Sequence, residues 1–157
     1  MTELVMANVL NLGAGRKIIQ GAVNHDREKY RPEIEVAHDL NLLPWPWEDN
    51  RFEHIIALAV LEHLPITLIQ SMNECWRILR PGGDIHLKLP MWNSERSYDD
   101  PTHYWRFSPN ALQVFDPKTK FGSSYSWYTP YKWRIIQKPW LNPTKTSIYA
   151  KLRVVKP

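Results

Sequence analysis

The chain has 157 residues, of which 43% are hydrophobic and 23% charged, with a formal net charge of +4. This is the composition of a globular protein, and the length suits one domain that buries most of its apolar surface. Since no apolar run is long enough to cross a bilayer and Cys75 is the only cysteine, we expect a cytoplasmic protein without an intramolecular disulfide.

Short apolar runs separated by turns fill the first third of the chain. We expect strands over residues 5–12, 22–26 and 35–38, followed by a loop rich in proline and tryptophan over residues 41–51. A further strand is expected over residues 52–60, where the near-continuous apolar character fits a parallel strand that is covered on both faces.

An amphipathic helix is expected next, because apolar residues recur at helical spacing between Leu64 and Leu79. The segment Pro81-Gly82-Gly83 should end this helix and turn the chain into a strand over residues 85–89. This order of strands and helix indicates an α/β sheet with parallel crossovers.

The last third of the chain begins with a long excursion over residues 91–121. One helix is expected there over residues 108–115, with Ser108 at the N-cap and Pro109 at the first helical position. Two apolar runs over residues 132–136 and 147–155 then predict a terminal antiparallel hairpin joined to the sheet.

Charge is divided unevenly along the chain. Residues 1–100 hold 10 Lys and Arg against 15 Asp and Glu, whereas residues 101–157 hold 10 Lys and Arg against Asp116 alone. Basic residues interleaved with aromatic ones favour a surface for nucleic acid or another phosphate-bearing partner. A solvated basic face over an aromatic layer explains the same composition, and an exposed aromatic tail would also suit a homodimer interface.

A glycine turn, Gly13-Ala14-Gly15, ends the first expected strand, and Asp26 and Asp39 end the next two. Glycines allow a close backbone approach to a ligand, and the two carboxylates could accept hydrogen bonds from ribose hydroxyls and an adenine amino group. The dinucleotide fingerprint would need a third glycine where Ile18 stands, and residues 16–20 leave room for barely one helical turn. We therefore expect a nucleoside cofactor without phosphate, and a nicotinamide-dependent oxidoreductase is disfavoured.

The ordered segments VLNLGAG, VNHD, AHDL, FEHIIALAVLEHL and ECWRILRPGGDIHLKLP resemble the motifs of class I S-adenosylmethionine-dependent methyltransferases, over about residues 8–116. The segments LPWPWEDNRFEHI and DDPTHYWRFSPNAL resemble a compact subgroup of that superfamily. The resemblance implies a Rossmann-like, doubly wound, mostly parallel seven-stranded sheet with a C-terminal antiparallel hairpin and, here, a shortened first helix. Residues 1–157 would form a single domain, with the cofactor half over residues 1–90 and a substrate loop and hairpin over residues 91–157.

The resemblance also implies where S-adenosylmethionine would bind. The glycine turn would contact its methionine part, Asp26 its ribose and Asp39 its adenine, and Asn11 stands where the family usually has an acidic residue. The full set of expected cofactor contacts is Asn11, Gly13, Ala14, Gly15, Asp26, Asp39, Leu40, Leu58, Ala59 and His63.

The methyl acceptor is expected to meet the segment YDDPTHYWRF at residues 98–107. His103 is the candidate general base, because an unperturbed imidazole titrates near neutral pH, and Arg106 could hold an anionic group. Asp100 and Trp105 are the other candidate substrate contacts, although the segment would also fit a structural loop in which Asp100 bonds backbone N–H groups. No spacing of cysteine and histidine suggests zinc, and no metal is expected.

We therefore interpret the sequence as an S-adenosylmethionine-dependent methyltransferase whose acceptor is not identified. The basic residues 101–157 favour a nucleic acid or another phosphorylated molecule as that acceptor. The alternative is a non-catalytic binding module of the same fold that docks nucleic acid or a protein partner.

Overall fold

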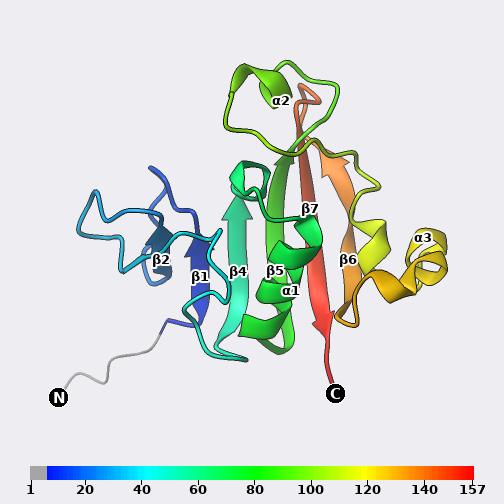
Figure 1. Cartoon of the computed structure of the whole chain (residues 1–157), viewed down its shortest axis with the longest axis horizontal. Helices are drawn as coiled ribbons and strands as arrows, with labels where there is room; N and C mark the ends of the chain where they lie inside the picture. Colours follow the sequence, from blue (N-terminus) through cyan, green and yellow to red (C-terminus); the bar gives the residue numbers. More distant parts are fainter. Residues whose placement is uncertain (1–6) are drawn as a thin grey trace.

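The computed structural model describes residues 7–157, and over these the chain forms a seven-stranded sheet in the order β3-β2-β1-β4-β5-β7-β6 (Figure 1). The first five strands pair in parallel, whereas β7 is antiparallel to both β5 and β6. The predicted mostly parallel sheet with a C-terminal antiparallel hairpin is confirmed. The strands are β1 (Val9–Leu12), β2 (Val23–Asp26), β3 (Val36–Ala37), β4 (Phe52–Leu58), β5 (Leu79–Pro90), β6 (Lys132–Leu141) and β7 (Ser147–Val155).

Helices are few and short in the described part of the chain. They are α1 (Leu68–Ile78), α2 (Arg96–Asp99) and α3 (Lys120–Ser124), with 3-10 helices at Leu61–His63, Gln113–Phe115 and Ser126–Tyr128. The longest is α1 at 11 residues, and none of the described helices has the length and apolar character that crossing a membrane requires. The beginning of the strand expected over residues 5–12 lies outside the described residues.

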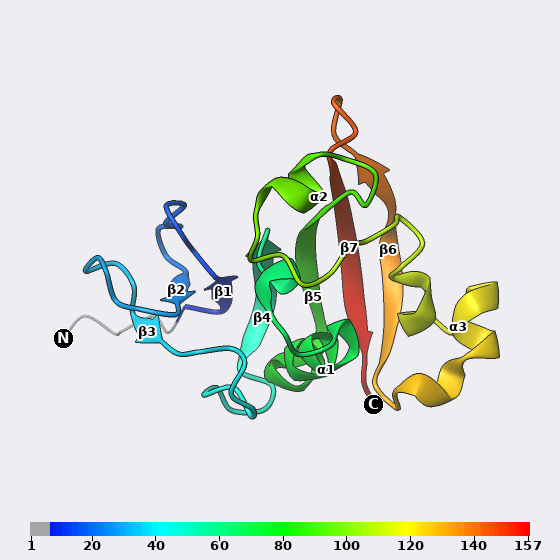
Figure 2. The same ribbon diagram turned by 45° about the horizontal axis from the view of Figure 1, so that its top comes forward.

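α1 lies on one face of the sheet over β5 and supplies the core beneath it (Figure 1, Figure 2). Its buried face carries Met72, Cys75 and Ile78, which join the same apolar cluster as the inward residues of β4 and β5. The helix begins four residues later than Leu64 because Thr67 caps it: the Thr67 hydroxyl accepts from the Gln70 N–H, and the Gln70 side chain accepts from the Thr67 N–H.

The proline- and tryptophan-rich loop before β4 is fastened to α1. Trp45 is buried, and its backbone N–H donates to Glu74 Oε2 at 2.7 Å. Arg77 pairs with the same carboxylate at 2.8 Å and donates to the carbonyls of Trp45 and Trp47. Burial alone would raise the pKa of Glu74, but the Arg77 guanidinium overrides it and the pKa is lowered.

No helix lies between β1 and β4 among the described residues, so the shortened first helix is fully replaced by turns. Side-chain amides satisfy the backbone there. Asn24 Oδ1 accepts from the Ile19 N–H at 2.9 Å and from Asn11 Nδ2 at 2.8 Å, while Asn24 Nδ2 donates to the Ile19 carbonyl. The buried Asn11–Asn24 pair therefore stands in for the hydrogen bonds a helix would make.

The expected end of the amphipathic helix at Pro81-Gly82-Gly83 is wrong. α1 ends at Ile78, and β5 runs from Leu79 through these three residues. A Cβ on Gly83 would lie 3.0 Å from the carbonyl oxygens of Arg80 and Glu53, so this glycine serves a close backbone approach inside the sheet. Phe52 of β4 pairs with Leu79, but His54, two residues on, pairs with Asp84, so β5 holds more residues than β4 at this point. The register of the two strands shifts there, as at a β-bulge.

The helix expected over residues 108–115 is also wrong, since a turn and the 3-10 helix Gln113–Phe115 occupy this range. The backbone bonds run from residue i to residue i−3, as in the Gln113 N–H to the Asn110 carbonyl. Among the buried residues, Leu112 and Phe115 are three apart, and the Phe115 N–H donates to the Leu112 carbonyl, as in a 3-10 turn.

Candidate functional site

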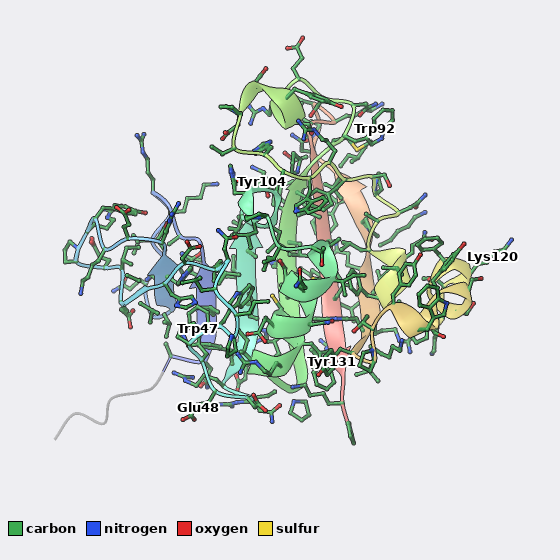
Figure 3. All side chains as sticks on the ribbon, viewed as in Figure 1. Trp47, Glu48, Trp92, Tyr104, Lys120 and Tyr131 are labelled. Carbon is green, nitrogen blue, oxygen red and sulfur yellow. The ribbon has the colours of Figure 1, made fainter. Side chains whose placement is uncertain are left out.

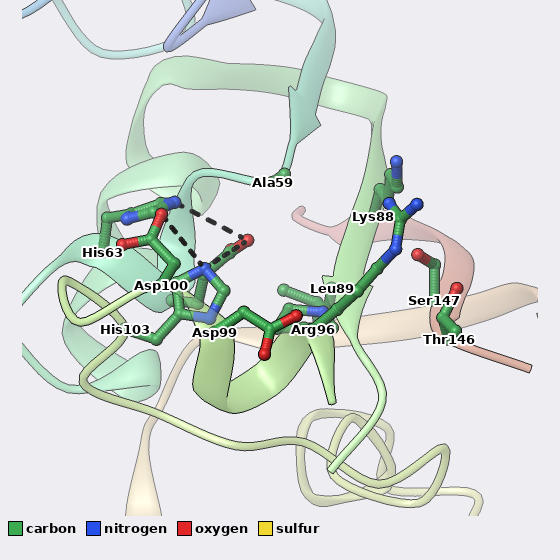
Figure 4. A pocket seen from close by; sticks show the side chains of 12 residues that line it. Ala59, His63, Lys88, Leu89, Arg96, Asp99, Asp100, His103, Thr146 and Ser147 are labelled. Atoms are coloured by element: carbon green, nitrogen blue, oxygen red, sulfur yellow. Dashed lines mark ion pairs between the residues drawn. The ribbon is translucent and has the colours of Figure 1, made fainter. Parts of the chain in front are cut away.

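Two cavities open at the carboxyl ends of the parallel strands and meet at the end of β4. The turn cavity, of about 430 Å³, is lined by the ends of β1 to β4 and includes Gly13, Asp26 and Asp39. The histidine cavity, of about 500 Å³, lies between β4, β5 and α2 and includes Glu62 and His103 (Figure 4). Both cavities are lined by Ala59 and His63.

The glycine turn is held in the left-handed region of the backbone at both glycines. Gly13 has a φ of +60°, and a Cβ there would lie 2.6 Å from Val60 Cγ2. Gly15 has a φ of +54°, and nothing lies within 4 Å of the place where its Cβ would stand. Glycine is thus required at Gly13 for space and conformation, and at Gly15 for conformation.

His25 links the ends of the first three strands beneath this turn. Its Nδ1 accepts from the Gly13 N–H at 3.2 Å, which leaves Nε2 to donate to the His38 carbonyl at 2.9 Å. Burial lowers the pKa of His25, so the neutral ring that this pattern requires is favoured.

The two aspartates predicted from the sequence both line the turn cavity. Asp26 accepts from the N–H groups of Gly15 at 2.8 Å and Arg27 at 2.7 Å. Asp39 accepts from the Asn41 N–H at 3.0 Å, while Asn41 Oδ1 is buried without a hydrogen-bond partner. The carboxylates are therefore fixed in place by the backbone, and an unused acceptor lies beside them.

Leu40 also lines the turn cavity as predicted, but three of the predicted contacts lie elsewhere. Asn11 is buried against Asn24 and the Lys17 carbonyl, and the Ala14 N–H donates to the His25 carbonyl. These two residues, like Leu58, are absent from the cavity lining. Four further residues line this cavity and were not predicted as contacts: His25, His38, Asn41 and Val60. Their only signal in the sequence is that they neighbour residues that were predicted.

In the histidine cavity, Glu62, His63 and His103 come together from two separate segments. Glu62 and His63 belong to the 3-10 helix after β4, and the Tyr104 N–H donates to the Glu62 carbonyl at 2.7 Å, which brings His103 alongside. Tyr104 lies near the carboxyl end of β4 (Figure 3). The Nε2 atoms of His63 and His103 lie 3.9 and 4.0 Å from Glu62 Oε1, and the centroids of the two imidazole rings are 4.6 Å apart. Figure 4 shows the two rings side by side at the cavity wall.

Burial governs the charges of this cluster. Glu62 is 1% exposed and its Oε2 has no hydrogen-bond partner. Burial raises the pKa of Glu62 to about 7 and lowers the pKa of His63. Sequence reasoning singled out both histidines but did not include Glu62, because nothing in its spacing shows that a carboxylate after a strand will be buried.

The predicted substrate contacts are divided between the cavity and the core. Asp100 lines the histidine cavity and accepts from the Thr102 N–H at 2.9 Å, as the structural-loop alternative expected. The Trp105 indole N–H donates to the Leu64 carbonyl at 2.7 Å and its ring packs against the core. The Arg106 guanidinium lies 4.5 Å from the centre of the Tyr98 ring, and neither Trp105 nor Arg106 is part of either cavity wall.

Comparison with known proteins adds a family and a fold. The family model described as "Methyltransferase domain" matches residues 6–87. Over 86 residues the chain is 31% identical to a Mycolicibacterium smegmatis protein named "Probable S-adenosylmethionine-dependent methyltransferase". This alignment covers 55% of this chain and 32% of that protein. The chain thus spans about a third of the length of this curated relative.

Solved structures share the fold at low sequence identity. An S-adenosylmethionine-dependent methyltransferase from Archaeoglobus fulgidus aligns with a TM-score of 0.62 at 15% identity, over 92% of this chain and 85% of that chain. Phosphoethanolamine N-methyltransferase 1 from Haemonchus contortus aligns with a TM-score of 0.68 at 14% identity, over 95% of this chain and 39% of that chain. A chain from a complex that contains the Haloferax volcanii Trm112 methyltransferase activator aligns with a TM-score of 0.62 at 13% identity, over 96% of this chain and 84% of that chain.

Proposed function

The chain belongs to the methyltransferase domain family, and from this premise we propose that it binds S-adenosylmethionine in the turn cavity and transfers the methyl group to an acceptor in the histidine cavity. The observation that carries the proposal is the placement of Gly13, Asp26 and Asp39 around one cavity at the ends of three neighbouring strands. This is the place where ligands bind in open α/β sheets.

The residues of the turn cavity fit the adenosine part of this cofactor. Asp26 holds two backbone N–H groups and retains lone pairs for a ribose hydroxyl. The buried and unpartnered Asn41 Oδ1, close in sequence to Asp39, suits an amino group such as that of adenine. Leu40 adds an apolar surface.

A dinucleotide fits less well. Residues 16–22, which follow the glycine turn, contain no helix, so no helix N-terminus is available to hold a pyrophosphate. The structure therefore supports a nucleoside cofactor without phosphate over a nicotinamide dinucleotide.

The bound cofactor would supply a methyl group on a positively charged sulfur. Ala59 and His63 line both cavities, so an acceptor in the histidine cavity would meet the cofactor at the end of β4. Such a displacement gains most from alignment of the two reactants, which the shared wall would provide. The role of His103 as a general base stays a prediction.

A second candidate function, docking of nucleic acid without catalysis, is favoured by exposed aromatic residues near α3. Trp127 is 75% exposed, and α3 lies at the β6 edge of the sheet, away from α2 (Figure 1, Figure 2). However, several tail cations are used within the chain: Arg134 pairs with Asp116 and Arg153 with Asp84. The basic surface is thus smaller than the sequence indicates.

Calorimetric titration with S-adenosylmethionine, S-adenosylhomocysteine and NAD tests the proposal. We expect both sulfur compounds to bind and NAD not to bind. Asp26→Ala should weaken binding by about 10-fold to 100-fold, because a hydrogen bond to a charged group is lost. Glu28→Ala removes the same charge at an exposed position outside the cavity and should leave binding unchanged.

The melting temperature of Asp26→Ala, measured alongside, separates lost contacts from lost folding. If neither sulfur compound binds the folded wild-type protein, the proposed function is wrong and the docking function becomes the better one.

A further inference from the structure

The cluster of Glu62, His63 and His103 brings three side chains that can act as metal ligands close together. One ligand atom from each residue lies within 4.8 Å of the others. The distances of 3.9 and 4.0 Å from Glu62 Oε1 to the two Nε2 atoms are too long for hydrogen bonds. The three side chains are thus gathered but not bonded to one another.

The hydrogen bond on the far side of His63 fixes its tautomer. Thr102 Oγ1 donates its hydrogen to Asp100 Oδ1 at 2.6 Å, so it can only accept from His63 Nδ1, at 2.8 Å. In the neutral ring the proton is then on Nδ1, and the Nε2 lone pair faces Glu62. Metal-binding histidines commonly donate their other ring N–H to an oxygen acceptor, and the Thr102 hydroxyl takes that place here.

His103 is oriented in the same way by the backbone. Its Nδ1 lies 3.3 Å from the Ser97 carbonyl, which can only accept, so Nδ1 carries the proton of the neutral ring. The Nε2 lone pair of this ring also faces Glu62, and the side chain is 9% exposed. Both imidazoles therefore present lone pairs to the same carboxylate.

Burial raises the pKa of Glu62, and its own backbone N–H and the charge of Lys88 offset this only in part. The residue is 1% exposed, and its Oε2 makes no hydrogen bond. Lys88 and Arg96 line the same cavity, yet no ion pair joins either of them to Glu62 within residues 7–157. A buried carboxylate is costly unless a cation or a set of donors compensates it.

We propose that Glu62, His63 and His103 bind a divalent transition-metal ion that closes the gap between the three ligand atoms. Two imidazoles and one carboxylate suit zinc, cobalt, iron or manganese, and a three-ligand set leaves positions open to the cavity. Tetrahedral ligands about 2.1 Å from zinc are about 3.4 Å apart, so each imidazole needs to approach Glu62 Oε1 by about half an ångström. All three ligand atoms already lie within 4.8 Å of one another.

The open positions would face the histidine cavity. If the proposed methyl transfer holds, an acceptor oxygen bound there would lose its proton more readily because of the charge of the ion. His103 would then act as a ligand in place of a general base. This last step rests on the proposed function, whereas the metal site itself does not.

Metal binding can be measured without cofactor or acceptor. Tag-free full-length protein is treated with chelator and titrated with Co²⁺, followed by the visible absorption of the bound ion, and with Zn²⁺, Mn²⁺ and Mg²⁺ by calorimetry. We expect one equivalent of Co²⁺ or Zn²⁺ to bind, and Mg²⁺, which prefers oxygen ligands, to bind far more weakly.

Three variants locate the ion. Glu62→Gln and His103→Ala should each weaken Co²⁺ and Zn²⁺ binding by at least about 100-fold, since each removes a ligand, whereas loss of an outer partner costs about 10-fold to 100-fold. His54→Ala removes a histidine that pairs with Asp84 on the exposed surface and should bind as the wild type does.

The proposal is overturned if Co²⁺, Zn²⁺ and Mn²⁺ all fail to bind the wild-type protein, or if binding survives in both ligand variants. Circular dichroism checks the fold of each variant, and Thr102→Val, which removes only the outer partner of His63, replaces a variant that does not fold. S-adenosylhomocysteine binding, measured separately, shows whether the turn cavity works, so failure of one site is distinguishable from failure of the other.

Discussion

The turn cavity and the histidine cavity share a wall at Ala59 and His63 but differ in how their polar groups are satisfied. In the turn cavity, Asp26 is bonded to the N–H groups of Gly15 and Arg27 before any ligand arrives. In the histidine cavity, Glu62 lies near two imidazoles but is bonded to neither. The first site is pre-organised by its own backbone, whereas the second gathers groups that only an added partner would satisfy.

The largest loss of stability is expected from Gly13→Ala, which changes the glycine turn of the turn cavity. The new Cβ would lie 2.6 Å from Val60 Cγ2, at a φ of +60° that alanine adopts only with strain. We expect a loss of about 2–4 kcal/mol in the free energy of unfolding, measured by urea denaturation, together with loss of S-adenosylhomocysteine binding.

Gly21→Ala provides the matched control for this substitution. Gly21 has a φ of +81° but nothing within 4 Å of its Cβ position, so only backbone strain, about 1–2 kcal/mol, should appear. Equal losses at the two positions would show that contact with Val60 does not matter. Val60→Ala combined with Gly13→Ala should recover part of the difference.

An effect of opposite sign is expected from Glu62→Gln in metal-free protein at pH 8. Glutamine keeps the shape but removes the buried charge, so the cost of holding an ionised carboxylate away from water disappears. Stability should rise by about 1 kcal/mol while metal binding is lost, as expected where a site keeps costly groups for function.

Urea denaturation with chelator present measures this change, and Glu53→Gln serves as the control because Glu53 is an exposed partner of Arg80. A clear loss of stability in Glu62→Gln would mean that the carboxylate already has a partner, and the contrast between the two cavities would disappear.

The succession of strands along the chain and the residues around the turn cavity were predictable from local signals. The glycine turn, Asp26 and Asp39 each follow a short apolar run, and parallel strands carry such positions to one edge of the sheet. The C-terminal hairpin followed from the alternation of apolar residues over residues 147–155.

The histidine cavity was not predictable in this way. His103 reaches Glu62 only because the chain returns after α2, held by the bridge between Met91 and Phe107 and by the bond from the Tyr104 N–H. These are long-range contacts that no spacing in the sequence reports. The strand through Pro81-Gly82-Gly83 was not predictable for a related reason. These residues lie between Leu79 and Asp84, which both pair with β4, so long-range pairing on either side sets the strand and local propensity does not.

The smallest effect is expected at Arg106, which the sequence placed among the acceptor contacts and the structure places outside both cavities. Its guanidinium stacks on the Tyr98 ring and donates to the His103 carbonyl at 3.2 Å, at an exposed position. Arg106→Gln should therefore change the free energy of unfolding by at most about 0.5–1 kcal/mol, the value of an exposed cation–π contact, and leave Co²⁺ and S-adenosylhomocysteine binding unchanged. If Arg106→Gln instead weakens Co²⁺ binding as strongly as His103→Ala does, the His103 ring depends on the Arg106 contact. The histidine cavity would then depend on the outer face of residues 98–107 as well.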